Sequence, residues 1–172
     1  LTKDGETTTE WKAEDQVVCG DAMPDCSGTF GINMDYRGIF LNMSFYYQFG
    51  GQTYNQTLVD RVENADVGLN VDKRIYNAVW KKPGDRVDFS YNPHRLTKPS
   101  SRFVQDLNEL RLSSLNVGYD FRHCAFLKKS RLQQLKASFY MDDVFRASTV
   151  KTERGLTYPF ARTFSFSLQA TF

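Results

Sequence analysis

The residues most able to carry chemistry in this sequence are three cysteines and two histidines. Cys19 and Cys26 are separated by six residues, a spacing that matches none of the common zinc motifs. His123 and Cys124 are adjacent, so on a strand their side chains point apart. We therefore expect no metal site. Cys19 and Cys26 form either a disulfide, if their loop faces the outside of a cell, or two unpaired thiols.

The carboxylates and the motif content give no better case for an enzyme. Asp142 and Asp143 are neighbours, and neighbours on a strand face opposite ways, which argues against a shared acid–base role. The sequence contains no GxSxG, P-loop or GxGxxG motif. We expect no catalytic residue, no cofactor-binding residue and no cofactor.

Basic side chains gather in one short segment, which contains Arg122, His123, Lys128, Lys129 and Arg131. This segment is either a solvated turn or a contact to the phosphates of lipid head groups. The whole chain is nearly balanced, with 22 basic and 20 acidic residues and a net charge of +2. We therefore expect no nucleic-acid partner.

Composition restricts the fold class. A chain of 172 residues can bury the core of one domain, and a charged content of 24% argues against general disorder. The mean hydropathy is −0.50 and no apolar run approaches the length of a spanning helix. The strands of a membrane β-barrel remain possible, because they alternate polar and apolar residues. Aromatic residues make up 15% of the chain.

Five segments alternate apolar and polar residues with a period of two, which predicts five amphipathic strands. We place them at 27–37, 39–50, 103–121, 131–143 and 161–172. The alternation breaks once, because Leu110 and Leu112 are in the opposite phase to Leu115 and Val117. A slip of one residue exchanges the two faces of a strand. Ser113–Ser114 is therefore a candidate β-bulge, or the point where the strand changes environment.

The connections help to choose between a soluble β-sandwich and an outer-membrane barrel, which the alternation alone does not separate. The links at 37–39 and 122–131 are short, and those at 51–101 and 143–162 are long. Short periplasmic turns that alternate with long extracellular loops are typical of up-and-down barrels. A Greek-key sandwich has no reason to show this alternation.

The long loop at 51–101 has a pattern of its own. A helix is predicted from an N-cap at Asn70 or Asp72 to the stop signal at 81–84. Its apolar stripe consists of Val71, Ile75 and Val79. Loops of this length are usually functional or disordered.

Several segments together resemble one family. Residues 98–121 resemble the C-terminal barrel region of SusC-like (RagA-type) TonB-dependent receptors of Bacteroidetes, and residues 158–172 resemble their terminal strand. Three further segments fit the same family: 20–28, 47–54 and 80–85. Each motif alone is weak, but together they cover the chain from about residue 17 to 172. Cys26 departs from the pattern, which leads us to expect an aromatic residue there.

The resemblance implies an all-β fold whose antiparallel up-and-down strands form the C-terminal part of a twenty-two-stranded transmembrane β-barrel. It implies a cell outer-membrane location and import of glycans or peptides into the periplasm. The plug domain is not within residues 1–172, and we expect the chain to be a piece of a larger receptor. The implied partners are a SusD-like surface lipoprotein, TonB through the missing N-terminal part, the remaining barrel and plug, and outer-membrane lipid.

In the barrel interpretation each face of the strands has a role. The lipid-facing residues are Phe30, Ile32, Met34, Leu41, Met43, Phe45, Val117, Phe139, Phe166 and Leu168. The lumen-facing residues are Asn33, Asp35, Asn42, Ser44, Asn116, Asp120, Lys136, Ser138, Ser167 and Gln169. Aromatic residues at strand ends suit the membrane interface, and the terminal Phe172 resembles the assembly signal of outer-membrane barrels.

Two other functions remain open at this stage. One is a freestanding carbohydrate-binding β-sandwich that uses exposed aromatic residues. The other is a strand donor to a homo-oligomeric barrel. In all three interpretations the chain is not an enzyme.

Overall fold

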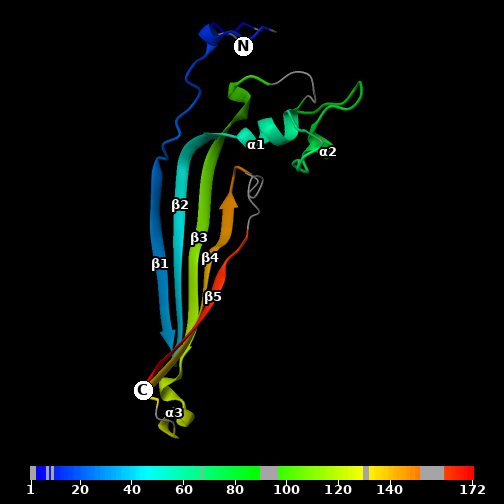
Figure 1. The fold of residues 1–172 in the computed structure, drawn as a ribbon. Coiled ribbons are helices and arrows are strands. Elements are labelled where there is room, and N and C mark those ends of the chain that lie inside the picture. Colours follow the sequence, from blue (N-terminus) through cyan, green and yellow to red (C-terminus); the bar gives the residue numbers. More distant parts are fainter. Residues whose placement is uncertain are drawn as a thin grey trace. The chain divides into compact units, whose positions relative to one another are not determined.

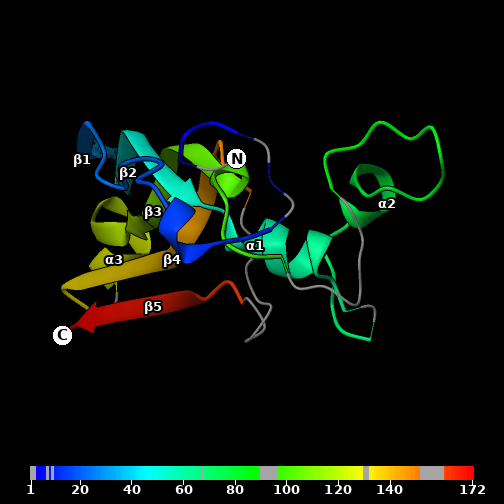
Figure 2. The ribbon, with the colours of Figure 1, turned by 90° about the horizontal axis from the view of Figure 1, so that it is seen from above.

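The computed structural model describes residues 3–6, 8, 10–66, 68–89, 97–129, 132–151 and 161–172. Its largest element is one five-stranded sheet in the order β1-β2-β3-β4-β5, so strands that are neighbours in sequence are neighbours in the sheet (Figures 1 and 2). The strands are β1 (Cys26–Tyr36), β2 (Ile39–Tyr54), β3 (Val104–Asp120), β4 (Gln134–Ser148) and β5 (Phe164–Thr171). The predicted all-β, antiparallel, up-and-down fold is confirmed.

The strand ends differ from the predicted ranges. β2 continues to Tyr54 and β3 begins at Val104, so the bounds of the expected loop, 51–101, have to be corrected to 55–103. β4 covers Gln134–Ser148 rather than 131–143. The alternation of apolar and polar side chains does not predict these extensions, because strands pair through backbone groups, which every residue carries.

The chain forms two compact units. The first comprises Leu1–Met23, Gly51–Asp106 and Val150–Tyr158, and the second comprises Pro24–Gly50, Leu107–Thr149 and Pro159–Phe172. The second unit holds most of the sheet, and the first holds the long loop.

Cross-strand pairs in the second unit keep the two faces of the sheet separate. Phe30 lies opposite Phe45, and their rings stack with centroids 4.8 Å apart. On the other face, Asn33 lies opposite Asn42. The pairs of β4 with β5 follow the same rule, since Phe139 faces Phe166 and Ser138 faces Ser167. Most residues of the two predicted sets therefore pair with a residue of similar polarity, and Asp35, opposite Phe40, is an exception.

The predicted irregularity at Ser113–Ser114 is confirmed. Leu112 pairs with Phe145 but Ser114 pairs with Asp142, so Ser113 faces two residues of β4. One of them, Asp143, has a φ of 48°, and aspartate tolerates this left-handed conformation better than most residues. The extra residue therefore belongs to β4, a strand in which no bulge was expected.

Several charged residues lie close to this bulge, in the first half of β3 and at the end of β4. The guanidinium of Arg111 lies 5.2 Å from the ring centroid of Tyr46, which puts it on the polar face of β2. Glu109 is buried, and it forms an ion pair of 2.6 Å with Arg146 and a longer one of 3.8 Å with Arg111. Burial of a carboxylate is tolerable here because cations neutralise it.

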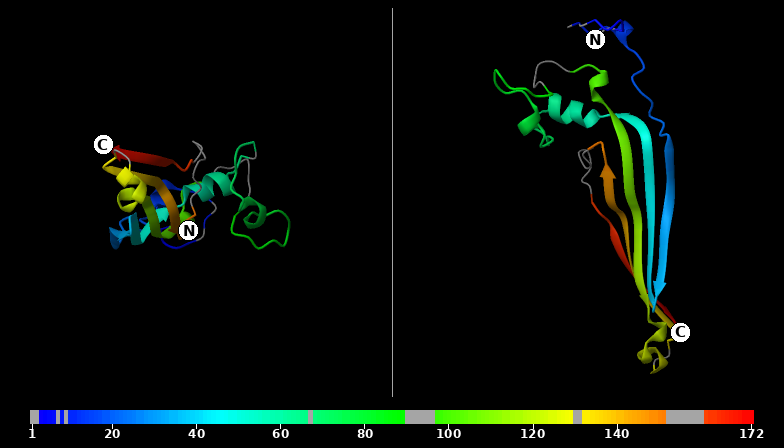
Figure 3. Two further views of the ribbon diagram at one scale, coloured as in Figure 1. Left: turned by 90° about the horizontal axis from the view of Figure 1, so that it is seen from below. Right: turned by 180° about the vertical axis from the view of Figure 1, so that it is seen from behind.

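The two short connections are built differently. Arg37 and Gly38 both have positive φ, 49° and 92°, and form the two-residue turn between β1 and β2. The connection from β3 to β4 contains a 3₁₀ turn, Phe121–His123, and the short helix α3 (Ala125–Lys129), which the sequence did not predict. α3 and the C-terminus lie at the same end of the sheet (Figure 3).

Helices in the first unit are short: η1 (Ala13–Asp15), α1 (Gln56–Leu58), η2 (Val59–Glu63), α2 (Ile75–Ala78) and η3 (Ser101–Phe103). The predicted helix from Asn70 or Asp72 is wrong in extent, because α2 has only four residues. Val79 already has extended backbone and forms a β-bridge with Phe89, which ends the helix. The helical segment Gln56–Glu63 was missed altogether.

Gly118 is expected to be required by packing across the sheet. A Cβ at this position would overlap the ring of Phe40 and the backbone carbonyl of Ala137. Gly118→Ala should lower the free energy of unfolding by about 1–3 kcal/mol, as over-packing does. The control is Gly31→Ala, whose Cβ would meet only the Met43 carbonyl oxygen at 3.3 Å. Equal losses for both variants in a denaturant titration would contradict the prediction.

Candidate functional site

The long loop has a hydrophobic core of its own. Leu58, Val59, Val62, Val79 and Phe103 are all buried. Tyr54, Ile75 and Phe89 pack against this cluster. Two members of the predicted stripe, Ile75 and Val79, thus face the core of the loop, whereas Val71 is half-buried and outside the cluster.

Asn55 joins the two ends of this loop. Its backbone N–H donates to the carbonyl of Phe103 at 2.8 Å, and its side-chain amide donates to Gln105 at 2.8 Å. Its side-chain oxygen accepts the backbone N–H of Leu58 at 3.3 Å and so caps α1. The sequence does contain a signal for this missed helix: an N-cap residue, Asn55, followed by apolar residues at helical spacing, Leu58, Val59 and Val62.

A buried carboxylate holds a second contact across the loop. The side chain of Glu63 is 7% exposed and forms an ion pair with Arg102. It also accepts the hydroxyl of Thr97 at 2.9 Å. The guanidinium of Arg102 lies 4.7 Å from the ring centroid of Phe103 and 5.9 Å from that of Phe89. Arg102 therefore joins the ion pair to the aromatic part of the core.

Asp72 and Arg74 fix the entry to α2. The guanidinium of Arg74 donates to both oxygens of Asp72, at 2.9 and 2.5 Å, and its backbone N–H donates at 2.8 Å. These bonds lower the pKa of Asp72 below its ordinary value of 3.8. The contribution to stability is therefore present above that value and is lost as the pH falls through the lowered pKa.

In the described part of the loop, two aromatic side chains remain outside the core. Tyr76 is 68% exposed and Trp80 is 48% exposed. The backbone carbonyl of Tyr76 accepts a hydrogen bond from the side-chain ammonium of Lys81. The backbone N–H of Trp80 donates to the backbone carbonyl of Phe89 at 2.9 Å. Their backbone is therefore held while the rings face solvent. Tyr76 and Trp80 form what we call the aromatic pair, a candidate binding surface.

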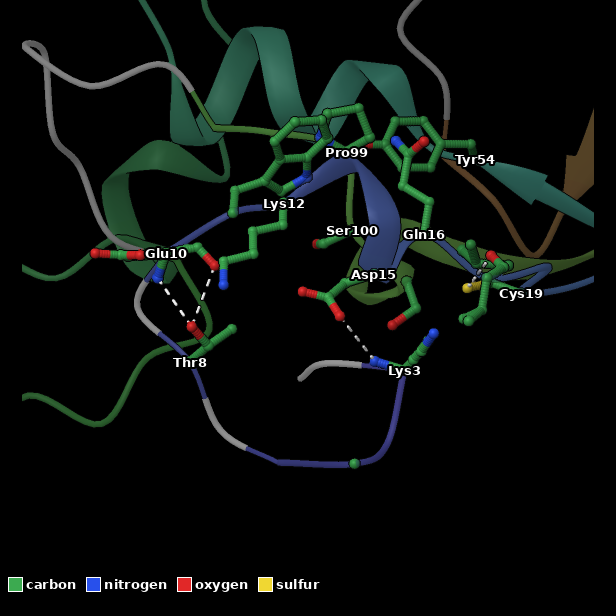
Figure 4. Close-up of a pocket in the computed structure, with 15 residues that line it drawn as sticks. Lys3, Thr8, Glu10, Lys12, Asp15, Gln16, Cys19, Tyr54, Pro99 and Ser100 are labelled. Carbon is green, nitrogen blue, oxygen red and sulfur yellow. Dashed lines mark hydrogen bonds between the residues drawn. The ribbon is translucent and has the colours of Figure 1, made fainter.

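A pocket of about 690 Å³ lies elsewhere in the first unit (Figure 4). Trp11 and Tyr54 supply aromatic walls, and Lys12, Asp15 and Gln16 supply polar groups. Lys98 places its ammonium 5.7 Å from the ring centroid of Trp11. The sequence did not predict this pocket, although Trp11 is one of only two tryptophans in the chain.

The cysteines and the aspartate pair do not form a site. Cys19, Cys26 and Cys124 are free thiols, which selects the unpaired alternative for Cys19 and Cys26. Asp142 accepts the hydroxyl of Tyr140 at 2.6 Å, and Asp143 occupies the bulge. Among the described residues no group of three or more His, Cys, Asp or Glu side chains could hold a metal.

Comparison with known proteins identifies the relatives. No family model matches the chain. TonB-dependent receptor P3 of Formosa agariphila is 26% identical over 193 residues, which cover 100% of this chain and 18% of the relative. The predicted similarity to TonB-dependent receptors is confirmed. The chain thus spans less than a fifth of the receptor that it matches.

The same fold occurs in solved structures of a transporter. The RagAB peptide importer in its open-open state matches with a TM-score of 0.71 and 17% identity, over 98% of this chain and 19% of the importer chain. The closed-closed state of the same importer matches with a TM-score of 0.69 and 17% identity, over 100% of this chain and 20% of the importer chain. None of the described helices is long and apolar enough to cross a membrane.

The Glu63–Arg102 pair generates a prediction for the loop. Arg102→Gln should destabilise the loop by about 1–3 kcal/mol, because it leaves the carboxylate of Glu63 buried without its cation. Hydrogen exchange of residues 55–64 should then become faster. Arg86→Gln, at an exposed position of the same loop, is the control. Equal exchange in both variants would show that the pair does not hold the loop.

Proposed function

We propose that this chain is the C-terminal barrel portion of a SusC-like TonB-dependent importer in the outer membrane. The observation that carries the proposal is the separation of the two faces of the sheet across paired strands. Apolar residues such as Phe30, Phe45 and Phe166 share one face, and several of them are exposed. A large exposed apolar face is expected where lipid, not water, is the neighbour.

The single sheet argues against the β-sandwich alternative. A sandwich needs two sheets whose apolar faces pack on each other. All five described strands belong to one sheet, with β1 and β5 at its edges. In the proposed barrel, further strands of the receptor pair with these two edges, because five strands are too few to close.

The face assignments follow from this proposal. In the proposed barrel, the ten apolar residues from Phe30 to Leu168 face lipid, and the ten polar residues from Asn33 to Gln169 line the lumen. Asp120 and Lys136 are cross-strand partners whose charges lie 3.8 Å apart, which suits a polar lumen wall. Phe172 serves in barrel assembly.

The proposed partners come from the whole receptor. The plug and the segment that contacts TonB lie in parts of the receptor outside this chain, and a SusD-like lipoprotein closes the barrel from outside. Peptides or glycans are the cargo. Likeness to a peptide importer and the folded loop with its aromatic pair support this assignment.

The lipid face can be tested in strand β5. Phe166→Arg should lower the stability of the full-length receptor in lipid by about 2–4 kcal/mol if the site is near the bilayer midplane. The neighbouring change Ser167→Arg should cost much less, since position 167 faces the lumen. Both are measured by folding titration into vesicles. Equal costs would refute the face assignment.

The aromatic pair can be tested without disturbing the core of the loop. Replacing Tyr76 and Trp80 with alanine should weaken capture of the lid lipoprotein by the full-length receptor about tenfold or more, as loss of aromatic anchors does. The control replaces Lys73 and Arg86, which are also exposed, with alanine. If the affinity for the lipoprotein and the uptake of substrate are both unchanged, the aromatic pair has no role in docking.

A further inference from the structure

The pocket of the first unit has two walls that come from distant parts of the sequence (Figure 4). One wall contains Tyr54, at the end of β2, and residues 99–104. The ring of Tyr54 contacts that of Phe103 edge-on, with centroids 5.8 Å apart, and Phe103 is completely buried in the core of the loop. The backbone N–H of Phe103 donates to the carbonyl of Ser100 at 3.4 Å. Packing in the core therefore fixes this wall.

The other wall is the N-terminal segment, which folds back on itself around the 3₁₀ turn η1. The backbone N–H of Lys3 donates to the carboxylate of Asp15, twelve residues further along the chain, at 3.5 Å. The backbone N–H of Gln52 donates to the carbonyl of Asp21 at 2.7 Å. This bond joins the N-terminal segment to β2, so both walls are attached to the same strand.

The space between the walls suits a small ligand with an apolar part. Its volume of about 690 Å³ is within the range of small-molecule sites. The indole of Trp11 is 46% exposed, and Lys98 places its ammonium 5.7 Å from the ring centroid. Val17, Val104 and Tyr54 supply further apolar surface. A ligand that covers Trp11 removes this surface from water, which favours binding.

Charged side chains of both signs line the same space. Two of them are lysines, Lys3 and Lys12, and two are acidic, Glu10 and Asp15. Lys12 and Asp15 point into the open part of the pocket (Figure 4). In the part of the chain that the structure describes, Lys12 and Asp15 form no ion pair, and Asp15 accepts the backbone N–H of Lys3 instead. One cation and one anion are therefore available to a ligand.

We propose that this pocket binds short peptides through their ammonium and carboxylate groups. The carboxylate of Asp15 binds the ammonium, the ammonium of Lys12 binds the carboxylate, and an apolar side chain of the peptide covers Trp11. An uncharged oligosaccharide would desolvate both charges without neutralising them, which costs free energy. The inference rests on the proposed function, in which the segment before β1 and the loop 55–103 face the outside of the cell, and it narrows the cargo to peptides.

The charged groups are tested first on the ligand, which leaves the protein unchanged. Binding of the tripeptide Ala-Phe-Ala to the detergent-solubilised full-length receptor is measured by isothermal titration calorimetry. Acetylation of its N-terminus and amidation of its C-terminus should weaken binding about tenfold or more, because the charge-assisted hydrogen bonds are lost. Equal binding of the free and the blocked peptide, or no binding of the free peptide, would overturn the proposal.

The variant Lys12→Gln/Asp15→Asn places the effect in the pocket. It should weaken binding of the free peptide about as much as blocking does, whereas the blocked peptide should bind the variant and the unmodified receptor equally. The control Arg86→Gln/Asp88→Asn also removes one charge of each sign, from exposed positions outside the pocket, and should leave binding unchanged. If blocking still has its full effect in the Lys12→Gln/Asp15→Asn variant, the peptide binds elsewhere and the proposal is wrong.

The aromatic wall and the glycan alternative are tested together. Trp11→Ala should weaken binding of the tripeptide about tenfold or more, as loss of an aromatic anchor does. Maltotetraose is the uncharged comparison ligand and should show no binding that depends on Trp11. Binding of maltotetraose that Trp11→Ala abolishes, with the affinity for the tripeptide unchanged, would assign the pocket to a glycan and overturn the proposal.

Failure of the inference can be told from failure of the proposed function. If the receptor assembles in the outer membrane but the tripeptide does not bind through Lys12, Asp15 and Trp11, only the inference falls. If the unmodified receptor is found outside the membrane fraction, the proposed function falls, and the inference falls with it.

Discussion

Register across the sheet is the constraint on which the rest of the structure depends. Because side chains alternate with a period of two, a shift of one residue in any strand would move its whole apolar set to the polar face. The pairs Phe30–Phe45 and Phe139–Phe166 show that the register keeps like with like. The bulge opposite Ser113 lies where the sequence of β3 changes phase, and Arg111, two residues earlier in β3, lies beside Tyr46.

Stability is supplied differently in the two units. The sheet buries few of its apolar side chains in this chain alone, and β5 is exposed along its whole length. Its strands therefore rely on backbone pairing and on neighbours that a complete barrel would provide. The loop instead buries Val62 and Phe103 completely and adds a buried ion pair. A loop with its own core can present Tyr76 and Trp80 in a fixed geometry, which lowers the entropy cost of binding.

The sequence predicted the strands better than the loop, for a physical reason. Alternation reports which residues share a face, so it located all five strands and the irregularity near Ser113. It does not report backbone pairing between residues of mixed polarity, which is why the extensions to Tyr54 and Ser148 were missed. The core of the loop depends on contacts between distant residues, such as Glu63 with Arg102, which no local pattern contains. The short α2 was overestimated because the bridge between Val79 and Phe89 overrides local helix propensity.

Charge placement connects the fold to its proposed environment. The chain as a whole is almost neutral, but its charges are not spread evenly. Glu109 and Asp120 are buried carboxylates of β3, Asp120 at its last position and Glu109 within the strand, and each is neutralised by arginine. Between them, from Leu110 to Tyr119, the only charged residue is Arg111, which lies close to the Glu109 end. A barrel strand needs an apolar surface only on its lipid side, so paired charges of this kind suit the polar face of the proposed barrel.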